Sequence, residues 1–274
     1  MGSRCQTKYP VVLVHGAGLR DRFLKLFNYW GRIPSALEKE GAVVYYGRQD
    51  CWASVETNAA FLSRRIEDIL RETNSRKVNI VAHSKGGLDA RMAASSFGCG
   101  DKIASVTTIA TPHLGSKTMD KLLAIPKPFW KVAALFVNVA ARVMGDKKPD
   151  FLKTCAALST DYMRRFNEQN PDVPGIYYQS FACVMSRPFS DVLEAVSYAV
   201  VKRIEGDNDG LVTVESAQWG SDFHIIRSNS YRGISHIDAI DFRRRRLTSK
   251  TGPNVSDIRD VYVDIVSRLK ERGL

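Results

Sequence analysis

A serine in a short sequence of small residues is the first feature of the chain that could do chemistry. Residues 78–87 read VNIVAHSKGG, so a β-branched run leads directly into the pattern Ala-His-Ser-Lys-Gly around Ser84. A nucleophilic serine is often placed in a sharp turn from a strand into a helix, where bulk two positions away would collide with the turn. Ala82 and Gly86 are small enough. The pattern predicts that Ser84 is a nucleophile, although small-Ser-Gly without its flanking strand and helix would be a weak signal.

A glycine-rich loop early in the chain could stabilise the charge that such a reaction creates. Residues 15–18 read HGAG and follow the apolar run YPVVLV at 9–14. When a serine attacks a carbonyl group, the oxyanion is stabilised by backbone N–H groups: the one after the nucleophile and one from a loop after an early strand. We therefore expect the amides of Lys85 and Ala17 to form an oxyanion hole. Taken alone, the loop would be an ordinary glycine-rich turn.

A serine nucleophile needs a general base, which is almost always a histidine. The chain has five histidines, which are His15, His83, His113, His224 and His236. The first two lie inside the motifs above, where histidines more often brace loops. In hydrolases with this turn the order is serine, acid, histidine, and only His224 and His236 leave room for a strand-end acid after Ser84.

The candidate acid is Asp209, within the segment EGDNDGLV at 205–212. A polar loop with a glycine precedes an apolar pair, as expected where the end of a strand presents a carboxylate. Asp207 is a close competitor, and a simple Asp/Asn/Gly turn is the alternative reading of the segment.

The elements that would position these residues alternate along the chain. Strands are predicted at 9–14, 42–46, 77–82 and 104–110, with helices at 30–40, 54–73 and 86–95 between them. This alternation predicts a parallel sheet covered on both faces by helices. Further strand signals at 175–184 and 224–226 and a closing helix at 255–269 complete a single α/β domain over residues 1–274.

The alternation is interrupted at 117–160, where no strand signal is found. The segment contains more apolar side chains than a solvated loop would expose, among them Phe129, Trp130, Leu135 and Phe136. We expect a helical insertion that acts as a mobile lid over an acyl-binding pocket, with a packed helical hairpin as the alternative. Basic residues flank the apolar ones and would favour an anionic lipid surface: Lys117, Lys121, Lys127, Lys131, Arg142, Lys147 and Lys148.

The composition is that of an ordinary globular protein. Hydrophobic residues make up 44% of the 274 residues and charged residues 25%, which excludes disorder, collagen and a coiled coil for the whole chain. Lys and Arg outnumber Asp and Glu by 40 to 29, and the net charge of +11 attracts acidic surfaces. Nucleic acid is not an expected partner, because the basic run at 243–246 lacks interleaved aromatic residues and belongs to no known module.

The sequence also bears on compartment and on cysteine chemistry. No stretch approaches the roughly 18 apolar residues of a membrane-spanning helix, and the polar residues 1–8 do not resemble a leader. A cytoplasmic protein is expected, with secretion open if a leader was removed. The five cysteines are odd in number and form no CxxC pair, which favours reduced thiols over disulfides or a zinc cluster.

Together these motifs resemble the bacterial true lipases, a triacylglycerol lipase-like family of the α/β-hydrolase superfamily. Five segments occur in family order over most of the chain: YPVVLVHG, VNIVAHSKGG, SVTTIATPHLGS, NDGLV and SHID. The resemblance implies an α/β-hydrolase fold, with a mostly parallel central sheet flanked by helices and a helical lid. It makes Ser84 the nucleophile, Asp209 the acid and His236 the base, with oxyanion donors at Ala17 and Lys85.

The resemblance further implies a structural calcium ion near the catalytic histidine. The matching ligands are Asp238, two residues after His236, and Asp191, which precedes NDGLV. The segment around Asp191 matches the family poorly, so two ordinary surface carboxylates are the alternative. Glu215 stands where some members have a cysteine, so their disulfide is not expected. The short path through 47–77 has no room for the zinc-binding insertion of thermophilic relatives, and zinc is not expected.

The sequence thus predicts a serine carboxylester hydrolase that acts on lipid acyl esters and requires no cofactor for its chemistry. The expected partners are a lipid or small ester and, peripherally, an anionic membrane or lipid droplet surface. A short-chain carboxylesterase or an acyltransferase with the same triad is one alternative. A basic protein that docks to membranes without turnover is the other. Acyl chain length and oligomeric state are left open.

Overall fold

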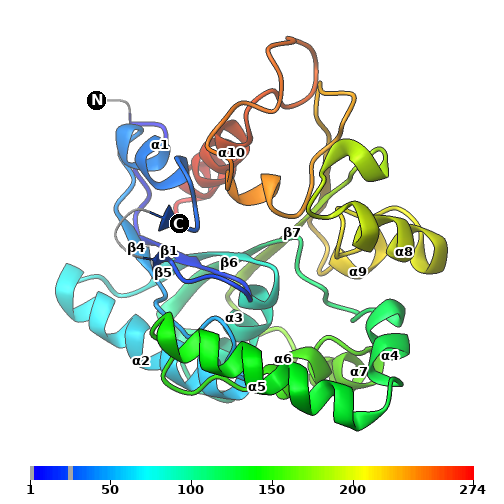
Figure 1. The fold of residues 1–274 in the computed structure, drawn as a ribbon. Helices are drawn as coiled ribbons and strands as arrows, with labels where there is room; N and C mark the ends of the chain where they lie inside the picture. Colours follow the sequence, from blue (N-terminus) through cyan, green and yellow to red (C-terminus); the bar gives the residue numbers. More distant parts are fainter. Residues whose placement is uncertain (1–2, 24–26) are drawn as a thin grey trace.

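A six-stranded parallel sheet forms the centre of the molecule (Figure 1). The computed structural model describes residues 3–23 and 27–274. The strands follow the order β4-β1-β5-β6-β7-β8, and each neighbouring pair is parallel. Their bounds are Val44–Tyr46 for β4, Val11–Val14 for β1, Val78–His83 for β5, Ile103–Ile109 for β6, Tyr177–Cys183 for β7 and Phe223–Ile226 for β8. The predicted parallel α/β sheet is confirmed. A small antiparallel pair that was not predicted, β2 at Arg22–Phe23 and β3 at Phe27–Asn28, lies outside it.

Helices cover both faces of this sheet. They are α1 Ile33–Lys39, α2 Val55–Thr73, α3 Lys85–Ser96, α4 Lys117–Leu123, α5 Lys127–Val143, α6 Phe151–Ala156, α7 Thr160–Gln169, α8 Ala195–Glu205, α9 Val214–Ala217 and α10 Ile258–Glu271, with 3₁₀ turns at Gly100–Lys102, Pro188–Ser190 and Asp238–Ile240. Figure 1 shows α1 and α10 on one side of the sheet and α2 and α3 on the other.

Strand β1 contributes side chains to two separate apolar cores, one on each face of the sheet. Val11 and Leu13 pack in one apolar cluster with residues of α1 and α10, whereas Val12 and Val14 pack in another with α2 and α3. Successive side chains of a strand point to opposite faces, so a run of valine and leucine is buried on both. This is why the early strands are continuously apolar in the sequence instead of alternating with polar residues.

The helix ends follow local capping chemistry. Ser54 accepts a hydrogen bond from the Thr57 amide and starts α2, and Asn74 ends it in the left-handed region at φ 51°. The predicted helix at 255–269 begins later, at Ile258, because Asp257 caps it through the Arg259 amide. The predicted helix at 30–40 likewise starts at Ile33, where a proline occupies the first turn.

The segment predicted as an insertion is helical in the structure. Helices α4, α5 and α6 lie within 117–160, and α7 begins at its end. Helix α5 lies on the outside of the molecule beside α6 (Figure 1). In the described ranges, no single helix is long and apolar enough to cross a bilayer, and α4 and α5 reach that composition only together, across a bend of 104°. The five cysteines, all of them described, are buried free thiols.

Candidate active site

Ser84 occupies the turn between β5 and α3. Its backbone has φ 54° and ψ −134°, a strained conformation for a residue with a side chain. The turn is held by hydrogen bonds from the Ser84 amide to the Ile109 carbonyl at 2.9 Å and from Thr111 Oγ1 to the Ser84 carbonyl at 2.7 Å. The serine is therefore fixed by the last residue of β6 and by the side chain of Thr111 just beyond it, and its own side chain is only partly buried.

The glycines after Ser84 allow α3 to pack directly against the sheet. A Cβ atom on Gly86 would lie 2.4 Å from the His15 carbonyl oxygen, and one on Gly87 would lie 2.3 Å from Thr111 Oγ1. Neither space can hold a methyl group unless backbone or strand residues move. The sequence pattern around the serine thus reflects a steric requirement at this crossing.

Asp209 and His236 form a buried hydrogen-bonded pair. His236 Nδ1 lies 2.8 Å from Asp209 Oδ2, and the side chains are 7% and 1% exposed. The other carboxylate oxygen accepts hydrogen bonds from the amides of Leu211 at 3.0 Å and Val212 at 2.8 Å, which fixes the acid. Burial disfavours a charged imidazole, but the Asp209 carboxylate outweighs burial and raises the pKa of His236 above its ordinary value. Asp207, the alternative acid, pairs instead with a lysine of α8.

The remaining candidate histidines are engaged elsewhere. His113 is fully buried, where its Nε2 lies 2.9 Å from Thr108 Oγ1, and burial together with Arg91 lowers its pKa well below the ordinary value. His224 lies in β8 at the edge of the sheet, where its Nε2 is 2.7 Å from Asp222 Oδ1. Neither histidine lines the cavity that contains Ser84.

Ser84 and His236 both line a single cavity of about 600 Å³. Asp209 lies behind His236 and is fully buried. Most other lining side chains are apolar: Leu19, Trp52, Met119, Trp130, Phe151, Leu158, Leu193, Leu211, Val212, Ile237, Ile240 and Phe242. Trp52 and Trp130 flank Phe151, with ring centroids 5.2 and 5.9 Å from it. The cavity can therefore hold an apolar chain beside a nucleophile and a base.

The residues predicted for the lid divide into two groups. Trp130 lines the cavity and donates its indole N–H to the Leu122 carbonyl at 3.1 Å. Phe129, Leu135 and Phe136 do not line it and are 70%, 63% and 70% exposed on α5. The helix therefore turns one aromatic residue inward and an apolar stripe outward, a division that the sequence did not resolve.

A tyrosine that sequence reasoning missed braces the predicted oxyanion loop. The hydroxyl of Tyr29 accepts a hydrogen bond from the Gly16 amide at 2.9 Å and lies 2.8 Å from His83 Nδ1. Because burial and repulsion from His236 hold the pKa of His83 well below its ordinary value, His83 is neutral and can accept from the phenol. Tyr29 thus ties the loop to the residue before Ser84. No motif surrounds it, so only the fold identifies it.

The two predicted oxyanion donors, Ala17 and Lys85, lie in the loop that Tyr29 holds and directly after Ser84. Ala17 lines the cavity, and Lys85 is the first residue of α3. No acceptor within residues 3–23 and 27–274 takes a hydrogen bond from the amide of either residue. The side chain of Lys85 forms a fully buried ion pair with Asp89 at 2.7 Å, which in turn accepts from Asn58 at 2.9 Å. The charge of Lys85 is therefore neutralised inside the protein, close to the start of α3.

The arrangement around Asp191 and Asp238 does not fit a calcium ion. The structure brings the two carboxylates together, but the guanidinium of Arg243 lies between them, at 2.7 Å from Asp191 and 2.8 Å from Asp238. Calcium takes six to eight oxygen ligands. In the described part of the chain, no group of three or more Asp, Glu, His or Cys side chains is arranged to hold a metal ion.

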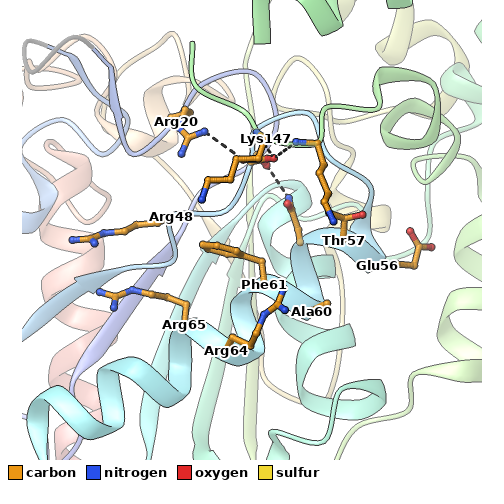
Figure 2. A pocket seen from close by; sticks show the side chains of 12 residues that line it. Arg20, Arg48, Glu56, Thr57, Ala60, Phe61, Arg64, Arg65 and Lys147 are labelled. Atoms are coloured by element: carbon orange, nitrogen blue, oxygen red, sulfur yellow. Dashed lines mark hydrogen bonds and ion pairs between the residues drawn. The ribbon is translucent and has the colours of Figure 1, made fainter. Parts of the chain in front are cut away.

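A second cavity, of about 710 Å³, lies beside the start of α2 and is basic (Figure 2). Its lining contains six cationic side chains, which are Arg20, Arg48, Arg64, Arg65, Lys147 and Lys148. Arg20 pairs with Asp50, and Arg65 pairs with a glutamate of its own helix. The other four form no ion pair with any residue that the structure describes. Asp50 and Glu56 also line the cavity, and Figure 2 shows the ring of Phe61 in the middle of the cluster, so the lining carries a net excess of positive charge.

Comparison with known proteins places this site in a family. A family model described as alpha/beta hydrolase fold matches residues 9–175, which include the glycine-rich loop and the serine turn. A triacylglycerol lipase of Pseudarthrobacter phenanthrenivorans is 29% identical over 98% of this chain and 98% of its own length. Triacylglycerol lipase 2 of Saccharomyces cerevisiae is 29% identical over 90% of this chain and 74% of its own length.

The fold comparison agrees with the sequence comparison. A metagenomic carboxyl esterase of known structure superimposes with a TM-score of 0.71 over 98% of this chain and 77% of its own, at 18% identity. At that identity the likeness concerns the fold alone. The sheet order, the serine turn and the histidine–aspartate pair described above are thus set in a fold with many solved examples.

Proposed function

Because the chain belongs to the alpha/beta hydrolase fold family, in the lipase-like branch that its relatives represent, we propose that it hydrolyses lipid acyl esters through a Ser84–His236–Asp209 triad. It is a carboxylic ester hydrolase. The observation that carries the proposed triad is that Ser84 and His236 line the same apolar cavity. Asp209 is hydrogen-bonded to Nδ1 of the imidazole.

The protonation of His236 defines its role. Its Nδ1 donates to Asp209, which leaves Nε2 with a lone pair to accept the proton of the Ser84 hydroxyl. Ser84 Oγ then attacks the ester carbonyl carbon and forms a tetrahedral intermediate. His236 returns the proton to the departing alcohol, and an acyl-enzyme remains on Ser84. Water, deprotonated by the same imidazole, cleaves the acyl-enzyme and releases the fatty acid. None of these steps uses a cofactor.

The amides of Ala17 and Lys85 would stabilise the oxyanion in both tetrahedral intermediates. They project from elements that are fixed independently, the loop braced by Tyr29 and the start of α3. Preorganised donors of this kind are worth about 10² to 10³ in rate each. The peptide N–H groups cannot be deleted by mutation of a side chain, so their contribution is reached indirectly through Tyr29.

The apolar cavity supports a lipid acyl chain as the substrate moiety. Trp52, Phe151 and Trp130 form an aromatic part of the cavity wall, and leucines supply much of the rest. Burial of each methylene contributes about 0.8 kcal/mol, so such a wall favours long acyl chains over short ones. A short-chain esterase with the same triad would gain little from it.

Initial rates on p-nitrophenyl butanoate and palmitate, for the wild type beside Ser84→Ala, test this proposal. We expect hydrolysis that is lost in the variant and a preference for the longer ester in the presence of detergent. Equal rates for both esters would indicate a short-chain esterase. Product esters formed from added alcohol in preference to free acid would indicate an acyltransferase. Undiminished hydrolysis by Ser84→Ala would contradict the triad.

We propose that α4 and α5 form the lid over this cavity. Trp130 closes one wall from α5, while the exposed residues Phe129 and Phe136 on the same helix face outward. A helix that is apolar on both faces suits an element that leaves the protein core for a lipid surface. Changing the outward residues Phe129 and Phe136 to Ser should lower activity on emulsified ester and leave that on soluble ester nearer to wild type.

The basic cavity of Figure 2 supports contact with an anionic lipid surface next to this lid. Lys147 and Lys148 follow the end of α5, and their backbone amides are held by Asp50 at 2.8 and 2.7 Å. Both side chains are exposed and form no ion pair with a residue that the structure describes. Exposed cations attract anionic headgroups with roughly 1 kcal/mol each. They stand beside the outward apolar stripe of α5, which would meet the acyl region.

Binding to vesicles tests the contact. The variant with Arg48, Arg64, Lys147 and Lys148 changed to Gln should lose sedimentation with phosphatidylglycerol vesicles. Its matched control changes four exposed cations elsewhere to Gln, which are Lys39, Arg76, Arg203 and Lys250. Equal loss in both variants would assign the binding to net charge and would contradict a localised surface.

A further inference from the structure

An arginine joins the two carboxylates beside the proposed catalytic histidine. Arg243 Nη2 lies 2.7 Å from Asp191 Oδ1, and Arg243 Nη1 lies 2.8 Å from Asp238 Oδ1. The two acids come from distant parts of the chain, one before α8 and one in the loop that carries His236. A single planar guanidinium therefore fastens two segments whose backbones otherwise meet at the short bridge between Met185 and Gly233.

Asp191 also holds Ser235, which precedes His236 in the chain. Asp191 Oδ2 accepts a hydrogen bond from Ser235 Oγ at 2.6 Å, and Ser235 Oγ accepts one from the Asp238 amide at 3.1 Å. Ser235 immediately precedes His236. Both oxygens of Asp191 are thus engaged, one by the arginine and one by the residue that sets the position of the imidazole.

The burial and charge of these groups make the cation necessary. The side chain of Asp191 is fully buried and that of Arg243 is 23% exposed. Two carboxylates this close would repel each other, and a buried carboxylate without a partner costs several kcal/mol in general. Burial by itself opposes ionisation of Asp191, but the hydrogen bonds from Arg243 and Ser235 outweigh it and hold its pKa below the ordinary value. A guanidinium suits this place because its planar fork can serve two carboxylates at once.

We propose that Arg243 is a built-in cation that holds the His236 loop in place, where the family resemblance implies a calcium ion. It is a positioning residue, because it touches neither the substrate nor the reacting atoms. The chain then needs no divalent metal for stability or turnover. The effect on turnover rests on the proposed role of His236, whereas the effect on stability does not.

The first test measures the melting temperature of the wild type and of Arg243→Ala, each in calcium, in magnesium and in chelator. The wild type should melt at the same temperature in all three. Arg243→Ala should melt about 5 °C lower in chelator, because it leaves two unpaired carboxylates. Calcium, but not magnesium, should recover most of that loss by entering the vacated space. Arg245→Ala, which removes an exposed arginine of the same loop that has no ion pair in the described residues, should match the wild type.

Kinetics separate positioning from general stability. At a temperature where every variant is folded, Arg243→Ala should lower kcat about 10- to 100-fold with KM nearly unchanged, because the base is displaced while the cavity is intact. Arg243→Lys keeps the charge but lacks the planar fork, so its kcat should lie between that of the wild type and that of Arg243→Ala.

Three results would overturn the proposal. The wild type could melt at a higher temperature in calcium than in chelator, which would show that a metal still has a place here. Arg243→Ala could retain wild-type melting and kcat, which would make the contact incidental. If Arg243→Ala fails to fold, Arg243→Lys takes its place. In chelator, Arg243→Lys could melt as far below Arg245→Ala as a variant without the charge would, and calcium could fail to raise its melting temperature. That result would remove the metal-like role. If the wild type has no esterase activity, only the proposed function is contradicted. The melting test of Arg243 remains valid.

Discussion

Ser84 and His236, the two halves of the proposed catalytic machinery, are held in place by different kinds of interaction. Ser84 is fixed by backbone geometry, with a positive φ, bonds to Ile109 and Thr111, and glycines at the helix crossing. His236 sits in a long loop and is fixed by polar side chains, namely Asp209, Glu194 and the Arg243 cluster. The nucleophile should therefore be sensitive to added volume, and the base to changes of charge and pH.

The largest effect should come from the acid itself. Asp209→Asn removes the acceptor charge that orients the imidazole, and an amide in its place favours the wrong tautomer. We expect kcat to fall about 10⁴-fold with little change in KM. Steady-state kinetics measure this, and a loss below about tenfold would show that another group orients His236.

Steric sensitivity on the serine side is tested by Gly86→Ala. The added methyl group would lie 2.4 Å from the backbone oxygen of His15, just after β1, so the free energy of unfolding should fall by about 3 kcal/mol. Gly98→Ala is the matched control: its φ of 64° is unfavourable, but its Cβ would meet no atom within 4 Å. It should cost only about 1 kcal/mol. Urea unfolding measures both, and equal losses would contradict a steric origin.

The charge sensitivity of the histidine side is tested by Glu194→Gln. Burial, with the nearby charges of Asp209 and Asp191, raises the pKa of Glu194 to about 8 although His236 opposes the rise. Because the folded pKa exceeds the unfolded value, the wild type loses stability as pH rises from about 4.5 to about 8 and then levels off.

Glu194→Gln cannot ionise and keeps an acceptor for the His236 amide, which now contacts Glu194 Oε2 at 3.1 Å. Relative to the wild type, the variant should gain stability throughout that pH interval, because it has no carboxyl group to ionise. Melting curves across the interval measure the gain. The exposed Glu271→Gln serves as control, and a parallel pH profile for Glu194→Gln and wild type would refute the assignment.

The smallest effect should come from Tyr29→Phe, on the serine side of the site. The variant loses the hydroxyl that holds the Gly16 amide and His83. We expect a loss of about 1 kcal/mol in stability and a kcat about tenfold lower, because the oxyanion loop loosens. A change confined to KM would mean that Tyr29 shapes the cavity and does not brace the loop.

The same contrast explains what could be predicted from the sequence. The serine turn and HGAG loop were predictable because their sterics depend on residues within a few positions, which leaves a local pattern. The parallel strands and α2 were predictable from apolar runs and from Ser54 as a cap. Helix α8 was missed, because its outer face carries exposed valines such as Val196, at 78%, that blur the periodicity.

The surroundings of His236 could not be predicted in the same way. Arg243 belongs to a basic run that reads as a solvated surface, and its contact with Asp191 spans 52 positions of the chain. Tyr29 reaches His83 across 54 positions. Such pairings leave no spacing in the sequence, and they appear only when the sheet has brought the loops together.

The central claim is that Ser84 is the nucleophile activated by His236. The most direct measurement is covalent labelling with a p-nitrophenyl alkylphosphonate, followed by peptide mass spectrometry. We predict one adduct, on Ser84, with labelling about 10⁴-fold slower in Asp209→Asn. An adduct on another residue, or hydrolysis that continues after complete labelling of Ser84, would contradict the account.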